Sequence, residues 1–182
     1  MLLQLLILIQ IGGLGIITIM SGLMISLHKK MGMKERILIQ DAFNLNSLSG
    51  LVKFVRKVIK GTFIVEGVGV LLYMTVFVPE FGLKGIWISV FTAISAFCNA
   101  GFDILGNGDS MGAYAKDPLV SITLMLLILL GGIGFPVWNE FIGPKKNQKF
   151  SAYTKFVLIL SGVYVALGAV VVALLEWNNP ET

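Results

Sequence analysis

The sequence predicts an all-α integral membrane protein. Of its 182 residues 56% are hydrophobic and 13% are charged, and the mean hydropathy of +0.88 is higher than a water-soluble domain needs. The apolar residues form long continuous runs, whereas the strands of a membrane barrel would alternate apolar and polar residues over about 10 positions. Basic residues gather between the runs, where membrane topology accounts for the net charge of +4 without a nucleic-acid partner.

The first apolar run, 1–27, is long enough to cross a bilayer, which takes roughly 20 helical residues. It lacks the basic start and the small-residue cleavage site of a signal peptide, so we predict a membrane span. The segment 28–60 follows, with eight Lys or Arg residues and apolar residues at helical spacing. It is predicted to be a cytoplasmic loop with an interfacial helix.

A second span is predicted for 61–78, ending before Pro79. The apolar piece 85–97 is only 13 residues, near 20 Å of helix at about 1.5 Å per residue, and cannot cross the membrane. We therefore expect a half-helix that enters the membrane and returns on the same side. A polar segment, a span at 118–138, a basic stretch and a last span at 152–175 follow.

The basic residues indicate the orientation. Eight lie in 28–60 and four in 143–155, whereas the alternate side carries only Lys84 and Lys116. Because cytoplasmic loops are enriched in Lys and Arg, the basic segments are expected in the cytoplasm and the loop after residue 97 near the outer face of the plasma membrane.

Two stretches form an internal repeat. "LIQIGGLGIITI" at 8–19 is similar to "LILLGGIGFPVW" at 127–138, and each has a G-G-x-G core within a span. Neither follows a strand or carries the Lys of a phosphate loop, so close helix packing or a bend is expected of the glycines, which are Gly12, Gly13, Gly15, Gly131, Gly132 and Gly134. The predicted order is an inner helix of a preceding repeat (1–27), a complete helix, loop and helix repeat (61–142), a cytoplasmic loop (143–151) and an outer helix of a following repeat (152–182).

The stretch "SAFCNAGFD" at 95–103 is the strongest candidate site. A short helix ending inside a membrane presents unpaired carbonyls and the negative end of its dipole, which favours cations. Beyond it, the carbonyls of Asn99, Ala100, Gly101 and Phe102 could replace the hydration shell of an alkali ion, and Asp103 would concentrate cations at the mouth. The alternative is an ordinary extracellular turn.

Together, the half-helix, "SAFCNAGFD" and "GGIGFPVW" resemble the membrane subunit of the Ktr/Trk/HKT superfamily of potassium transporters, the Ktr type above all. The resemblance implies an incomplete set of K+-channel-like repeats with Asn99–Phe102 as a selectivity filter for K+, or also for Na+. It further implies a homodimer on a cytosolic nucleotide-binding regulatory subunit. The superfamily carries four filter loops and this sequence shows one, so a fragment or an incomplete gene product is expected.

Glu66 lies inside the second predicted span, where a carboxylate faces protein or water. Two roles stay open for it, a hydrogen bond between packed helices and a place on the ion path. Beyond Glu66 the spans offer almost no catalytic groups, and one Cys and one His make a metal centre or a cofactor site unlikely to form. A membrane-embedded enzyme and a non-conducting structural subunit are the alternatives to an ion pathway.

Overall fold

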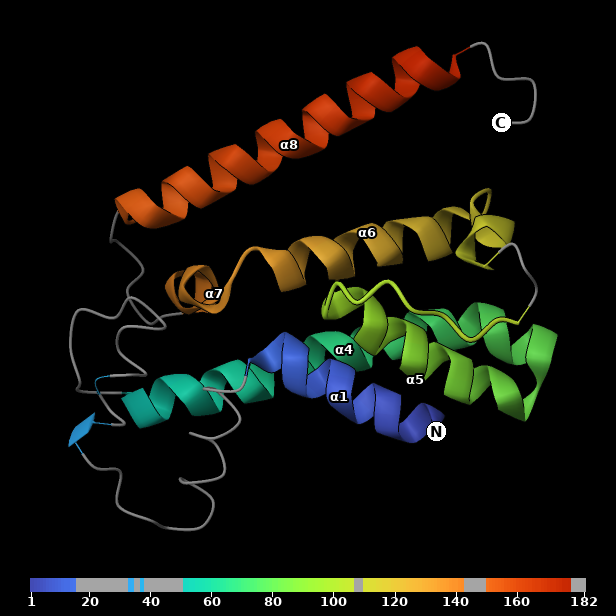
Figure 1. Ribbon diagram of the computed structural model, residues 1–182, viewed down its shortest axis with the longest axis horizontal. Coiled ribbons are helices and arrows are strands. Elements are labelled where there is room, and N and C mark those ends of the chain that lie inside the picture. Colours follow the sequence, from blue (N-terminus) through green and yellow to red (C-terminus); the bar gives the residue numbers. More distant parts are fainter. Residues whose placement is uncertain (16–32, 35–36, 38–50, 107–109, 143–149, 178–182) are drawn as a thin grey trace. The chain divides into compact units, whose positions relative to one another are not determined.

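The computed structural model describes residues 1–15, 33–34, 37, 51–106, 110–142 and 150–177. Within these residues the regular structure is entirely helical (Figure 1). The chain divides into two compact units, Met1–Phe135 and Pro136–Thr182. Each unit is described by itself.

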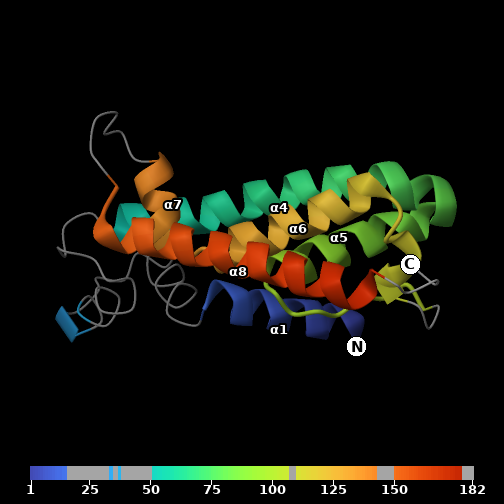
Figure 2. The ribbon, with the colours of Figure 1, turned by 90° about the horizontal axis from the view of Figure 1, so that it is seen from above.

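The described part of the first unit includes the helices α1 (Leu2–Leu14), α4 (Leu51–Phe81), α5 (Leu83–Phe97) and α6 (Pro118–Gly132) and the short 3-10 helix η1 (Ser110–Tyr114). The helices α4 and α5 lie antiparallel and pack along each other, α6 contacts both, and α1 packs on α5 (Figures 1 and 2). Gly82, with φ 59°, makes the turn between α4 and α5. A Cβ on Gly85 would overlap the carbonyl of Phe77, so the start of α5 needs glycine to lie this close to α4.

The helix α4 begins at Leu51, and the predicted boundary at residue 61 is wrong. The segment expected to form a separate interfacial helix is the first part of one 31-residue helix. Phe54, Val55 and Val58 are buried, whereas Arg56 and Lys57 are exposed. The same helical face therefore continues across the predicted boundary from the basic segment, and α4 also runs on through Pro79, before which the predicted span ends. The rest of the predicted 28–50 loop lies largely outside the described residues.

The helix α5 matches the predicted short helix to within two residues at its start. Its 15 residues span about 22 Å at ~1.5 Å per residue, less than the roughly 30 Å hydrocarbon core of a bilayer. Phe91 and Ala93 are fully buried and Phe97 is 2% exposed, so α5 lies at the centre of the first unit.

Both G-G-x-G sequences end a helix. The helix α1 stops at Leu14 and is followed by Gly15 with φ 77°, and α6 stops at Gly132, two residues before Gly134 with φ 90°. A left-handed residue breaks helical geometry, and glycine adopts it at no steric cost. Within the described residues, neither of the predicted spans 1–27 and 118–138 is a single helix. Residues 16–27 of the first span lie outside the described residues.

The second unit contains α7 (Phe135–Ile142) and α8 (Ala152–Glu176). The side chain of Ser151 caps α8 by accepting a hydrogen bond from the Thr154 N–H at 3.2 Å. Within the part of the chain that the structure describes, two helical stretches are long and apolar enough to cross a membrane, Phe54–Phe81 and Ala152–Leu175. The helices α1, α5 and α6 are apolar but shorter. These lengths and the absence of strands among the described residues agree with an all-α membrane fold.

Candidate functional site

The loop after α5 begins with a helix-ending motif. The Ala100 N–H donates to the Ser95 carbonyl at 2.9 Å and the Asn99 N–H donates to the Ala96 carbonyl at 3.1 Å. Asn99 itself is left-handed, with φ 53°. These are the two hydrogen bonds and the left-handed residue of a Schellman motif, in which Asn is the commonest substitute for Gly. Asn99 therefore ends α5, and the chain turns back there toward the N-terminal end of the helix.

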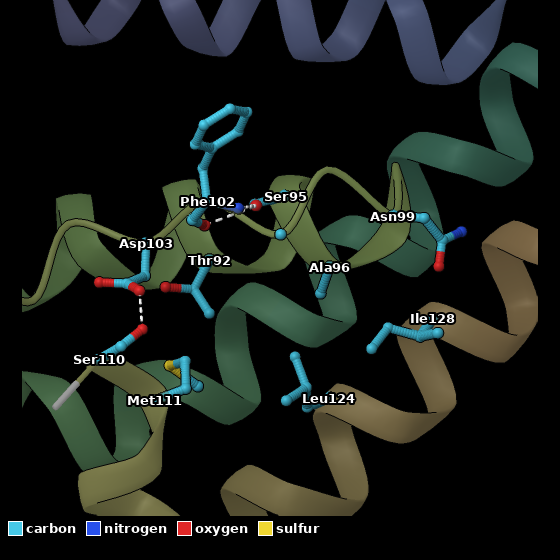
Figure 3. A pocket seen from close by; sticks show the side chains of 11 residues that line it. Thr92, Ser95, Ala96, Asn99, Phe102, Asp103, Ser110, Met111, Leu124 and Ile128 are labelled. Carbon is cyan, nitrogen blue, oxygen red and sulfur yellow. Dashed lines mark hydrogen bonds between the residues drawn. The ribbon is translucent and has the colours of Figure 1, made fainter. Parts of the chain in front are cut away.

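The hydroxyl of Ser95 holds the segment of the loop that runs back along α5. It donates to the Phe102 carbonyl at 2.6 Å and accepts from the Phe102 N–H at 2.9 Å (Figure 3). Ser95 is only 2% exposed, and its one hydroxyl pairs with both polar atoms of the Phe102 backbone. Ser95 is not among the residues predicted for the site, although it is the last of three hydroxyl residues on the apolar helix and so the nearest to the loop that follows.

The four predicted filter residues lie together at the end of α5. Gly101 is left-handed with φ 73°, and a Cβ built on it would meet nothing within 4 Å, so its backbone borders open space. Ala100 packs with the apolar cluster between α1 and α5, and the Phe102 ring is 53% exposed. The Phe102 carbonyl already accepts the Ser95 hydrogen bond. Coordination of an ion by the carbonyls of this loop stays a prediction.

Asp103 makes hydrogen bonds to the residues that follow the predicted filter. One carboxylate oxygen accepts from the Leu105 N–H at 3.2 Å, and the other accepts from the Ser110 hydroxyl at the start of η1 (Figure 3). The side chain is therefore partly buried and bonded. Its carboxylate therefore lies beside the loop, and the predicted role at a pore mouth stays a prediction.

A pocket of about 270 Å³ lies between this loop, α5 and α6. Leu124 and Ile128 face it from α6, whereas the Phe102 ring points away from it (Figure 3). The Thr92 hydroxyl is buried there without a hydrogen-bond partner among the described residues. At roughly 30 Å³ per water the pocket has room for several waters. Its lining consists of Thr92, Ser95, Ala96, Asn99, Gly101, Phe102, Asp103, Ser110, Met111, Leu124 and Ile128.

Both glycine motifs pack against the base of the loop. A Cβ on Gly131 would overlap the Phe97 carbonyl, and a Cβ on Gly13 would overlap the Cys98 thiol. Gly132 is less crowded, because its Cβ would lie 3.8 Å from the Asn99 side-chain nitrogen. The two helices that carry the repeat thus both approach α5 where the candidate site begins.

Glu66 lies in α4 and is 3% exposed. The Gln10 side-chain nitrogen in α1 donates to both of its oxygens, at 2.8 and 3.1 Å. Of the two roles left open by the sequence, the structure contains the hydrogen bond between packed helices. Glu66 does not line the pocket beside the loop.

A hydrogen bond and a ring contact join η1 to the C-terminal end of α4. The Tyr114 hydroxyl donates to the Glu80 carboxylate at 2.7 Å, and the Tyr114 ring packs edge-on against Phe77. Burial, followed by the hydrogen bond to Glu80 and the charge of Glu80, raises the pKa of Tyr114 to about 12. The tyrosine therefore stays a neutral donor at physiological pH.

Comparison with known proteins gives a consistent result. The profile of the cation transport protein family TrkH matches residues 1–177. The potassium/sodium uptake protein NtpJ of Enterococcus hirae is 35% identical over 94% of this chain and 38% of its own length. Ktr system potassium uptake protein B of Bacillus subtilis is 36% identical over 96% of this chain and 39% of its own, and protein B of Vibrio alginolyticus is 34% identical over the same shares.

The chain spans about two fifths of the length of these relatives. The match nevertheless covers nearly all of the chain, including the half-helix, the loop and both glycine motifs. The family is one of cation transporters rather than enzymes. The chain is a membrane protein that belongs to the TrkH family of cation transport proteins.

Proposed function

We propose that this chain forms part of the pore of a Ktr-type potassium-uptake protein, with Asn99–Phe102 as one of its filter loops. The observation that carries the proposal is the backbone of that loop, which follows a half-length helix and alternates in handedness. Asn99 and Gly101 have positive φ, and Ala100 and Phe102 between and after them do not. In extended backbone successive carbonyls point to opposite sides. Alternating handedness lets them share a side, as a ring of ion ligands requires.

Electrostatics support the same assignment. The C-terminal end of α5 carries the negative end of the helix dipole, and the carboxylate of Asp103 lies just beyond the loop. A dehydrated cation is favoured at such a place, and no cofactor is needed for passive permeation. K+ is the ion expected from the relatives' names, and the name of NtpJ keeps Na+ as a second cargo.

The pore needs more units than the one described here, and α6 offers a surface for the next. When the two glycine motifs are aligned in sequence, Leu6 and Ile9 of α1 correspond to Met125 and Ile128 of α6. Leu6 and Ile9 pack on α5 and are each 8% exposed, whereas Met125 is 55% and Ile128 is 40% exposed. We infer that α6 supports the half-helix of another repeat as α1 supports α5.

In this arrangement the basic segments face the cytoplasm and the filter loop lies near the outer face of the plasma membrane, following the charge bias of the sequence. The family resemblance adds a homodimer and a cytosolic nucleotide-binding regulatory subunit, which would control opening from the cytoplasmic side. Both partners remain predictions.

Potassium uptake in a transport-deficient cell tests the proposal, with this segment expressed inside a full-length Ktr-type polypeptide. We expect Gly101→Asp to abolish uptake or to remove the preference for K+ over Na+, while the protein still reaches the membrane. Gly106→Asp is the matched control, because Gly106 also has positive φ and open space around its Cβ position but lies beyond the filter. Equal uptake and selectivity in the two variants would leave the loop an ordinary turn in a non-conducting subunit.

A further inference from the structure

The pair Glu66 and Gln10 leaves one group unsatisfied if Glu66 is ionised. An ionised carboxylate only accepts hydrogen bonds, so the Gln10 amide can offer it only the NH2 group. The amide oxygen of Gln10 is then buried without a partner among the residues that the structure describes. A buried acceptor left in this state is destabilising.

We propose that Glu66 carries a proton and forms a two-bond acid–amide pair with Gln10, and that this neutral pair positions the end of α5. The recorded contacts place the Gln10 nitrogen 2.8 and 3.1 Å from the two Glu66 oxygens, and the pair forms when the amide turns so that its oxygen faces one of them. The carboxyl O–H then donates to the Gln10 oxygen, and the Gln10 NH2 donates to the carboxyl C=O. Every polar atom of the two side chains then has a partner. The transport part of this proposal rests on the proposed function, and the protonation part does not.

The surroundings of Glu66 favour the neutral form. It is 3% exposed within a stretch of α4 long and apolar enough to cross a membrane. Among the described residues, the hydrogen-bond partner recorded for Glu66 is the neutral Gln10, and Thr62, one turn earlier on the same face of α4, is fully buried with a hydroxyl that has no partner among those residues. An isolated ionised carboxylate in such a place is costly, whereas a protonated one with two hydrogen bonds is not.

The pair lies where it can fix the base of the filter loop. Gln10 follows Ile9, which packs in one apolar cluster with Phe91 of α5, and precedes Gly13, which lies against Cys98. The position of α1 therefore determines two contacts with α5: Ile9 with Phe91, and Gly13 with Cys98, the residue before Asn99. By joining α1 to α4, the pair holds α1 against the helix from which the loop begins.

Variants of the pair test its positioning role within a full-length Ktr-type polypeptide. We expect Glu66→Gln to keep K+ uptake and the K+ to Na+ selectivity ratio within about two-fold, because an amide pair retains both hydrogen bonds. Glu66→Leu and Gln10→Leu should each lower the selectivity ratio by about five-fold or more, since one interhelical bond pair is worth roughly 1 kcal/mol or above. Reversal of the pair, Gln10→Glu with Glu66→Gln, should restore it.

Thr75→Ala is the control on α4, because the Thr75 hydroxyl bonds only to its own helix at the Leu72 carbonyl, 2.7 Å away. It should leave the ratio unchanged. If Glu66→Gln loses transport as severely as Glu66→Leu, a negative charge is required and the neutral pair is wrong. An unaltered selectivity ratio in both leucine variants would overturn the positioning role.

Infrared difference spectroscopy between the unmodified protein and Glu66→Gln tests protonation without any transport. The unmodified protein should show the C=O stretch of a buried protonated carboxyl at neutral pH, and the variant should lack it. A carboxylate signal at that pH would overturn the proposal. Failure of the Gly101→Asp test with the carboxyl band present would instead count against the filter and leave the acid–amide pair intact.

Discussion

At the scale of single residues, Ser95 controls the conformation of the candidate filter. Ser95→Ala removes both hydrogen bonds to the Phe102 backbone, each worth about 0.5–1.5 kcal/mol. We expect reduced K+ over Na+ selectivity in ion-flux assays on the reconstituted full-length protein. The control is Ser89→Ala, since Ser89 is equally buried on α5 but bonds within the helix to the Gly85 carbonyl. Matching flux ratios in both variants would contradict this role.

Adjacent glycines in the second motif should respond differently to the same change. Gly131→Ala forces a methyl group onto the Phe97 carbonyl, which is backbone and cannot swing away, so overpacking should cost about 1–3 kcal/mol. Gly132→Ala meets only ordinary contact with the Asn99 side chain and should be nearly neutral. Thermal unfolding of the detergent-solubilised protein measures the difference, and an equal loss in both would show that the close approach does not constrain α6.

The sequence predicts which residues form the loop, but it predicts only part of what each of them does. Gly101 is predicted as part of the filter loop, and in the structure it has a positive φ. Asn99 is predicted as an ion ligand, and in the structure its left-handed backbone ends α5. Ser95 and Gln10 were not singled out, because each acts on a partner in another segment, seven and 56 residues away.

At the scale of helices, length and hydrophobicity predicted α5 and α8 well, since α5 differs from its predicted range by two residues at its start and α8 by one residue at its end. The start of α4 was misplaced because basic residues were taken to mark a boundary. In the structure they lie on one face of a helix whose other face is already buried. Charge on one face does not stop a helix, since its backbone hydrogen bonds are unaffected.

The junction between α7 and α8 should depend on pH. Partial burial raises the pKa of Glu140, but hydrogen bonds from the Ser151 side chain and N–H and from Thr154 lower it more, so its pKa lies below the usual 4.5. A lowered pKa means that the carboxylate form stabilises the junction: its contribution is complete above the usual pKa and is lost as the pH falls through the lowered value.

Hydrogen exchange measures this effect at the Ser151 amide, which donates to Glu140 at 3.0 Å. After correction for the intrinsic rate, protection should decrease on acidification in the unmodified protein. In Glu140→Gln it should be lower at neutral pH and should no longer change with acidification. A pH-independent protection factor in the unmodified protein would contradict the assignment.

At the scale of the whole molecule, the exposed apolar face of α6 has a counterpart in the packed face of α1. If another repeat covers it, Ile128→Ala in the full-length protein should cost about 2–5 kcal/mol, as for a buried core residue. Ile122→Ala is the control: Ile122 is 53% exposed and aligns with Leu3, which is 58% exposed in α1 and so lies on an unpacked face. Unfolding midpoints in detergent distinguish the two, and equal shifts would argue against a packed repeat on α6.

The sequence by itself determined the membrane class, the short helix, the loop with its glycine, and the repeat, since each depends on local composition or on spacing along the chain. Only the tertiary structure decided which groups meet: Ser95 with Phe102, Gln10 with Glu66, and the two glycine motifs with the end of α5. It also showed that those motifs end helices rather than lying within continuous spans. The physical reason is that hydrophobic pattern specifies how a segment buries itself, whereas hydrogen bonds and close approaches between distant segments are specified only once the helices have packed.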